Sequence, residues 1–307
     1  MFFGNDMYFI VIVGALLLNM IVGRLFSPFP GFIVNAHISA ANSFSKYRYR
    51  TSRFWGAVIT IILFVIIWAA VQLALLFLQA QSVIYAYIIY GLSVFAFVQC
   101  GQLCGKVRKL KGELENEVYV REIFSSLLAR DAKLLDRQNI KKIFSATVTK
   151  IVAERIITSA LLLLILGPGA SAAYIFLNTL ANSDDSERIK SHGFADFAIK
   201  LNNIISYPGY LILSLVFWCI KWVTGLKYEK KTEKIKLRPA AQLSEFSSSR
   251  ELEDDFIGRT EILIYASTVL FALIVAACYV FIEAAFAAIG LDEYWNFWNG
   301  KNIGKNT

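Results

Sequence analysis

The sequence contains few charged residues for its length. Of its 307 residues, 18% are charged, whereas 57% are hydrophobic and 14% are aromatic. The mean hydropathy of +0.54 lies outside the range of an ordinary soluble domain. We therefore predict an all-α, polytopic integral membrane protein in the lipid bilayer, with about six transmembrane helices in a single membrane domain over residues 1–307.

Cysteine and histidine are scarce, and their positions argue against two kinds of site. The four cysteines lie in or beside apolar runs, where a thiol behaves as a small buried hydrophobe, so no disulfide framework is predicted. Cys100 and Cys104 share one helix face, but the only histidines, His37 and His192, are far away in the sequence. We therefore predict no metal site at these cysteines.

Acidic residues are absent from the loop that follows the first apolar run. Residues 7–26 are predicted to be a retained span, and the loop after them carries Lys46, Arg48, Arg50 and Arg53. The positive-inside rule places this loop in the cytoplasm and the N-terminus outside. The net charge of +8 is also explained by orientation in the membrane, because most basic residues lie beside apolar runs. No nucleic-acid partner is therefore predicted.

Two uncharged runs, residues 55–79 and 82–104, predict a pair of spans joined as a helical hairpin. Residues 105–156 are predicted to be a cytoplasmic insertion of two helices, the second of which begins after Asp136. Residues 194–205 form an amphipathic pattern, which suits either a helix in the membrane interface or a helix packed against other spans.

The last part of the chain contains two further apolar runs, at residues 208–226 and about 262–290. Between them, residues 227–261 are predicted to be a cytoplasmic linker, because a basic cluster opens this segment and a Ser- and Glu-rich stretch follows. Aromatic residues after the last run favour an outer interface, so the C-terminus is also predicted to lie outside.

The central apolar run, residues 156–180, is interrupted by Gly167-Pro168-Gly169. Proline has no N–H to donate, and the flanking glycines relax the backbone, so the helix is broken there. The run either crosses the membrane with a kink or returns as a re-entrant hairpin. Loop charge favours the crossing, because it places the basic cluster after residue 226 in the cytoplasm.

Polar residues within or beside this central run are the candidates for chemistry. Such groups are costly to bury in lipid, so they need partners, water or a task. The candidates are Arg130, Asp131, Glu154, Arg155 and Asn178. A structural interpretation is also available for each. Arg130 and Asp131 would cap a helix bend, Glu154 and Arg155 would mark the water interface, and Asn178 would join two spans.

A series of short motifs surrounds these candidates in a characteristic order. They are Ala129-Arg130-Asp131, Ala153-Glu154, Pro168-Gly169-Ala170, Tyr174 followed by Asn178-Thr179-Leu180, Gly193-Phe194-Ala195, and Ile204-Ile205-Ser206-Tyr207-Pro208. In this order they resemble the CobD/CbiB family of cobalamin biosynthesis. Members of that family are integral membrane proteins that attach an aminopropanol, or its phosphate, to a corrinoid acid as an amide.

The resemblance implies an enzyme of the bacterial inner membrane with a corrinoid substrate. It implies catalytic roles for Arg130, Asp131 and Glu154, of which the carboxylates would act as bases or metal ligands. It also implies substrate binding by Asn178 and Thr179, and a requirement for ATP and Mg²⁺ if the family activity is retained.

Several positions depart from the family pattern. Asn19 stands where the family has Asp, Arg155 where it has Asn, and Thr158-Ser159 where it has Asp-Gly. Because ionisable groups have been lost, a second function is also expected. The chain would then be a catalytically degenerate membrane protein with a regulatory or cell-envelope role, like the related AmpE branch. A transporter is a third possibility, since Asn19 and Glu283 are polar groups within spans.

Overall fold

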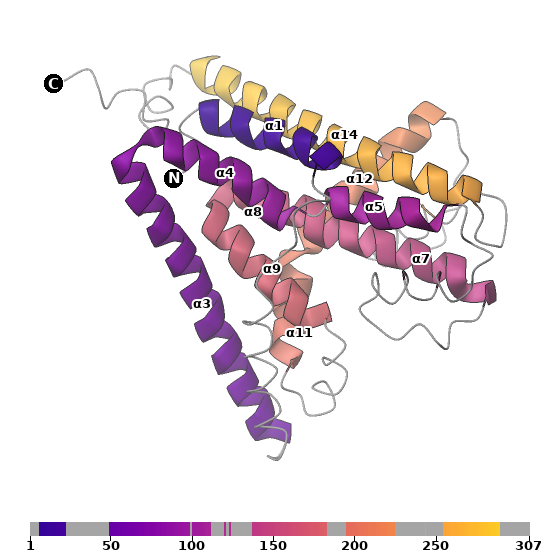
Figure 1. Ribbon diagram of the computed structural model, residues 1–307, viewed down its shortest axis with the longest axis horizontal. Coiled ribbons are helices and arrows are strands. Elements are labelled where there is room, and N and C mark those ends of the chain that lie inside the picture. The colour runs from indigo at the N-terminus through magenta and orange to yellow at the C-terminus, as the bar shows by residue number, and fades with distance from the viewer. Residues whose placement is uncertain are drawn as a thin grey trace.

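The computed structural model describes residues 6–22, 49–98, 100–111, 120, 123, 137–182, 195–224, 243 and 254–288. These residues form helices, with no strand among them, which confirms the predicted all-α class. Figure 1 shows a bundle of helices from which one long helix, α3, diverges at one end.

The first four described helices are α1 (Asp6–Val22), α3 (Tyr49–Gln81), α4 (Val83–Phe97) and α5 (Cys100–Leu110). Ser82 separates α3 from α4, and its hydroxyl oxygen accepts a hydrogen bond from the Ile84 amide at 3.3 Å, which caps the start of α4. The predicted helical hairpin is therefore present, with a very short connection (Figure 1).

The third predicted span is broken between α4 and α5, and Asn19 bridges the break. The buried Asn19 side chain donates to the Val94 carbonyl at 3.3 Å and accepts from the Gly101 amide at 3.3 Å. Helix ends leave such backbone groups without partners inside the helix. An amide can both donate and accept, whereas an ionised Asp at this position could only accept.

The remaining helices are α7 (Arg137–Ile151), η2 (Val152–Thr158), α8 (Ser159–Leu166), α9 (Pro168–Asn182), α11 (Asp196–Ile205), α12 (Tyr207–Thr224) and α14 (Asp254–Ala288). Helix α7 is the second helix predicted in the insertion, and it continues without a break into the π-helix η2. Helix α14 starts at Asp254, inside the predicted linker, because two acidic residues favour a helix N-terminus.

The expectation that residues 156–180 cross the membrane in one direction is wrong, because the chain turns back at Gly167. Gly167 has a φ of 86°, which suits glycine, and Pro168 opens α9 at the position where proline is best tolerated. The Ser171 hydroxyl donates to the Ser159 carbonyl at 3.1 Å, and Asn182 reaches back to Glu154. Helices α8 and α9 therefore form a helical hairpin.

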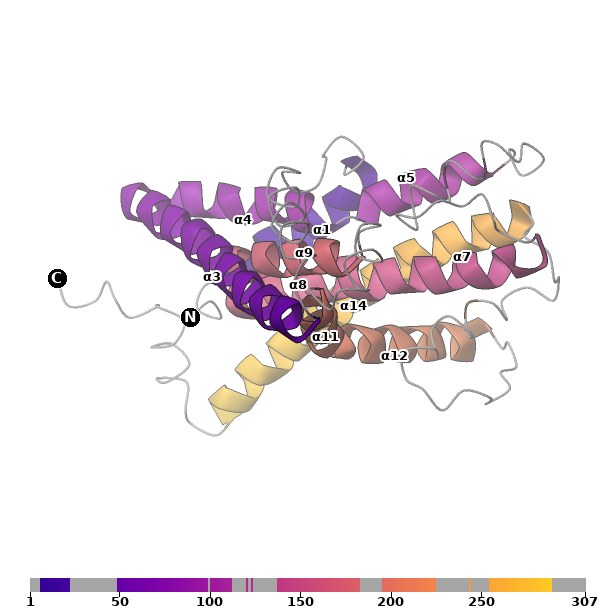
Figure 2. The same cartoon turned by 90° about the horizontal axis from the view of Figure 1, so that it is seen from below.

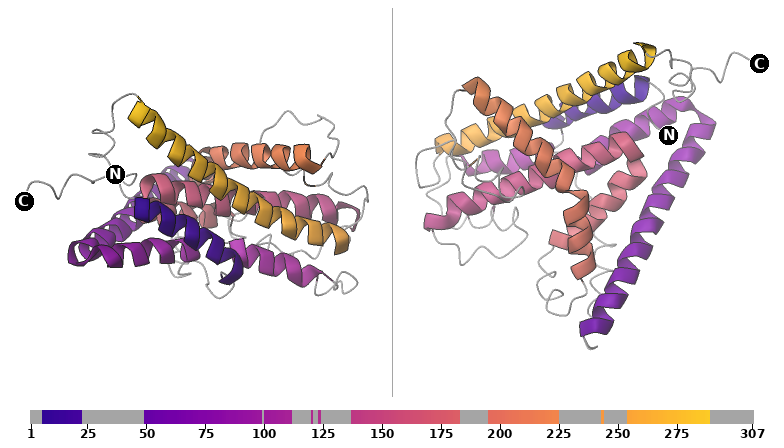
Figure 3. Two further views of the ribbon diagram at one scale, coloured as in Figure 1. Left: turned by 90° about the horizontal axis from the view of Figure 1, so that it is seen from above. Right: turned by 180° about the vertical axis from the view of Figure 1, so that it is seen from behind.

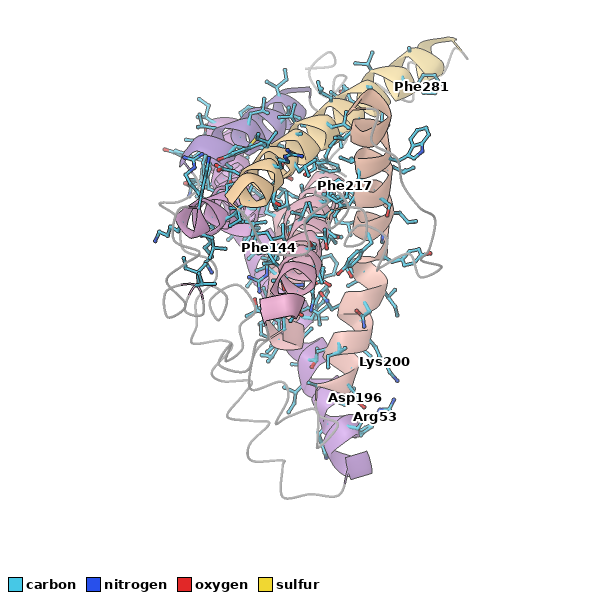
Figure 4. The ribbon with its side chains drawn as sticks, turned by 90° about the vertical axis from the view of Figure 1, so that its right-hand side faces the viewer. Arg53, Phe144, Asp196, Lys200, Phe217 and Phe281 are labelled. Carbon is cyan, nitrogen blue, oxygen red and sulfur yellow. The ribbon has the colours of Figure 1, made fainter. Side chains whose placement is uncertain are left out.

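The returning helix α9 is enclosed by other helices. Thirteen of its 15 residues are buried, and it packs against α3, α8 and α11. Helix α11 covers α9 and α3, so the packing alternative for the amphipathic segment is the one observed. An ion pair of 3.6 Å joins Arg53 at the start of α3 to Asp196 at the start of α11 (Figure 4). Because other helices enclose α9, its backbone is kept away from lipid, and membrane proteins tolerate a broken helix in such a position.

Fewer than six candidate membrane spans are found among the described residues. Three helical segments are long and apolar enough to cross a bilayer, at Arg53–Gln81, Ile84–Leu110 and Ile257–Phe281, and the second of them comprises α4 and α5. The pair α11 and α12, bent by 43°, would make a fourth. Helix α12 runs along one side of the bundle in Figure 2, and α1 lies beside α14 in Figure 3. Six spans are therefore not confirmed: the first run gives only a shorter apolar helix, Ile10–Met20, and the run at residues 156–180 folds as the α8–α9 hairpin.

We predict that Gly169→Ala destabilises the protein. An added Cβ would lie 2.7 Å from the Trp68 carbonyl oxygen of α3, so either helix would have to move. Overpacking of this kind costs about 1–3 kcal/mol. The control is Gly14→Ala in α1, where no atom lies within 4 Å of the added Cβ, and where alanine favours the helix. Thermal unfolding in detergent should separate the two variants, and equal midpoints would contradict the α3–α9 packing.

Candidate functional site

A buried carboxylate lies where three helical segments meet. Glu154 in η2 is 2% exposed. Its Oε2 atom accepts from Asn178 Nδ2 at 2.6 Å and from Asn182 Nδ2 at 3.1 Å, and its Oε1 atom accepts from the Tyr210 hydroxyl at 2.9 Å. Burying an ionised carboxylate is very costly unless it is hydrogen-bonded, so these three donors make its position possible.

Asn178 is the residue that connects this carboxylate to the rest of the site. Its Nδ2 atom also donates to Asn202 Oδ1 at 3.1 Å, and its Oδ1 atom accepts from Arg155 Nε at 2.9 Å. The amide therefore lies between a negative and a positive side chain and bonds to both. We call Glu154, Arg155, Asn178, Asn182, Asn202 and Tyr210 the Glu154 cluster.

Helical spacing explains how each segment contributes. Asn178 and Asn182 are four residues apart on α9, so they share one face. Asn202 and Tyr210 lie on either side of the bend between α11 and α12. The turn at Gly167 brings α9 back to the level of Glu154, which is 24 residues earlier in the chain than Asn178.

The segment that carries Glu154 is the π-helix η2, and α12 packs closely against it. The Thr158 hydroxyl donates to the Ala153 carbonyl, five residues back, at 2.7 Å. Gly209 of α12 packs directly on these two groups, and any Cβ at position 209 would overlap both. This close approach brings Tyr210 within reach of Glu154. Short π-helical stretches occur frequently at functional sites.

The structure brings together only some of the residues predicted from the sequence. Glu154 and Asn178 are in direct contact, and Arg155 joins them. Thr179 lies outside the cluster, because its hydroxyl donates to the Ile175 carbonyl of its own helix at 2.8 Å. Arg130 and Asp131 lie outside the described residues. The roles assigned to these three residues by resemblance stay predictions.

Sequence reasoning missed Asn182, Asn202 and Tyr210. A signal for them was present, because polar residues recur at helical spacing within otherwise apolar helices: Asn182 follows Asn178 by four positions, and Tyr210 follows Asn202 by eight. That spacing identifies a shared face. It does not say which other helix the face contacts, so Glu154 could not be assigned as the common partner.

The described residues do not supply a full set of side-chain ligands for a metal ion. No group of three or more His, Cys, Asp and Glu side chains in this part of the chain is arranged to hold a metal ion. An ionised carboxylate has about four lone-pair positions, and the hydrogen bonds of Glu154 occupy three of them. The remaining position suits one more N–H or O–H donor from a ligand.

We predict that Asn178→Leu destabilises the protein strongly, whereas Thr179→Val does not. The first change leaves Glu154, Arg155 and Asn202 each without one hydrogen bond. The loss should be about 3 kcal/mol, since a charged group is left short of partners. The second change removes only a bond within the helix. Thermal unfolding in detergent is the measurement, with an expected fall of about 5 °C or more for Asn178→Leu. Equal midpoints for the two variants would contradict the cluster.

Comparison with known proteins gave one match. Residues 12–233 match the family model described as CobD/Cbib protein. No curated protein and no solved structure matched the chain. The matched segment contains every member of the Glu154 cluster.

Proposed function

The chain belongs to the CobD/CbiB family, and we propose that it joins an aminopropanol, or its phosphate, to a corrinoid acid as an amide in cobalamin biosynthesis. One observation carries this proposal: the 2.6 Å contact between Glu154 and Asn178 unites two motifs of the resemblance. Tyr210, which follows a third motif, completes the carboxylate's hydrogen bonds.

The arrangement supports a role for Glu154 in holding the amine. In amide formation the amine nitrogen bonds to the carbonyl carbon of the activated acid, the bond from that carbon to the activating phosphate breaks so that phosphate leaves, and the amine loses a proton. Three donors bond to the two oxygens of Glu154, and one acceptor position is left for an amine N–H. Activation of the acid with ATP and Mg²⁺ remains an expectation from the family, and Asp131, which the resemblance offers as a metal ligand, lies outside the described residues.

We predict that the chain restores cobalamin synthesis in a strain that lacks the family synthase, and that Glu154→Gln abolishes this. Glutamine keeps the size of the side chain but loses the negative charge and one acceptor oxygen. Misplacing the amine should lower the rate about 10²-fold or more. The matched control is Thr147→Val in α7, which removes only a hydroxyl bond to the Ile143 carbonyl of its own helix. Immunoblots of membranes must show equal amounts of each protein. Full restoration by Glu154→Gln would exclude this role.

A second function is favoured by one specific contact. Arg155 stands where the family has Asn, and it occupies the side-chain oxygen of Asn178 while placing a positive charge beside Glu154. A cluster that is neutralised in this way suits a catalytically inactive protein with a regulatory or cell-envelope role, as in the AmpE branch. This alternative also explains why several family carboxylates are missing.

Substitution at Arg155 separates the two functions. If the chain is a synthase, Arg155→Asn should keep or raise the rate of corrinoid amide formation in isolated membranes. Arg155→Leu should lower that rate about 10-fold, because Asn178 loses a hydrogen bond that helps to orient it. The product is measured by mass spectrometry. If the unchanged chain and Arg155→Asn both yield no product at normal abundance, the regulatory function is favoured.

A further inference from the structure

Several buried oxygen atoms around the α8–α9 hairpin form no hydrogen bond with the described residues. They are Gln72 Oε1, Ser159 Oγ, the Tyr174 hydroxyl and Ser206 Oγ. Buried polar groups in folded proteins almost always have a partner, which is often an ordered water molecule when no protein group is available. These four buried atoms therefore need partners other than the described residues.

Tyr174 is the clearest case. It is 0% exposed and lies one helical turn before Asn178 on α9. Its polar neighbours, the Thr158 hydroxyl and the Asn178 amide, also bond to other groups. The Thr158 hydroxyl donates to Ala153, and the Asn178 amide bonds to Glu154, Asn202 and Arg155. A phenol both donates and accepts, so its full capacity is not used by the described residues.

Ser206 presents a second hydroxyl on the adjoining helices. It lies at the bend, four residues after Asn202 and four before Tyr210. Backbone bonds of 2.9 Å to Asn202 and 3.2 Å from Tyr210 continue the helical spacing through the bend. Ser206 therefore shares the face that carries two members of the Glu154 cluster, and it is also 0% exposed.

We propose that the Tyr174 end of the Glu154 cluster binds a hydroxyl group, supplied either by a water molecule or by an alcohol of a bound ligand. A hydroxyl group both donates and accepts, which is what a phenol and a serine in the same buried region require. The carboxylate of Glu154 disfavours an anion there, and Arg155 disfavours a cation. The inference does not rest on the proposed ligation, because an inactive family member would need the same partner.

Radiolytic hydroxyl-radical footprinting of the full chain in detergent tests this site. Bound water is converted to radicals in place, so a buried side chain beside water is oxidised although bulk solvent cannot reach it. Tyr174 is compared with Phe176, which lies on the same helix and is also 0% exposed. We expect Tyr174 to be oxidised at least about 10-fold faster than Phe176, in line with the water molecules that buried polar groups bind.

A second arm adds 1-amino-2-propanol as a probe for a ligand hydroxyl. Rapid oxidation that the amino alcohol suppresses would assign the site to a ligand hydroxyl, and rapid oxidation that it leaves unchanged would assign the site to water.

In a Tyr174→Phe variant, oxidation at position 174 should fall to the rate of Phe176. Protection of Tyr174 equal to that of Phe176, with and without the amino alcohol, would overturn the proposal. Rapid oxidation in Tyr174→Phe would overturn the assignment to the phenol. None of these outcomes depends on whether the chain restores cobalamin synthesis.

Discussion

A carboxylate enclosed by helices is the constraint on which the centre of this structure depends. Glu154 is buried, and its ionised form requires donors that its own helix cannot supply. Those donors come from Asn178 and Asn182 on α9 and from Tyr210 on α12. These hydrogen bonds therefore fix the position of α9 along η2, and they fix the place where α12 crosses η2. Loss of one donor would affect several helices together.

Two glycines make this geometry possible. Gly167 adopts a backbone conformation that suits a residue without a side chain, and this turns the chain from α8 into α9. Gly209 lets α12 approach Ala153 and Thr158 closely enough for Tyr210 to reach Glu154.

The positions of many helices could be predicted from the apolar runs. Whether a run continues in one direction or turns back could not be predicted from them. The runs at residues 55–79 and 82–104 predicted the α3–α4 hairpin, because long uncharged stretches require a helix in lipid. The run at 156–180 was predicted to cross, since loop charge was interpreted as if every run crosses once. Its two halves are instead stabilised by bonds between Ser171 and Ser159 and between Asn182 and Glu154. Charge in distant loops carries no information about such contacts.

The sequence by itself determined the helical membrane class, the family, and the choice of Glu154 and Asn178 as candidates. These conclusions follow from composition, from polar residues in apolar runs, and from motif order, all of which are local properties of the chain. Only the tertiary structure decided that α9 returns, that Asn202 and Tyr210 join the site, and that Arg155 bonds to Asn178. The physical reason is that helical periodicity defines the polar face of one helix, whereas a hydrogen bond also requires the distance to another helix.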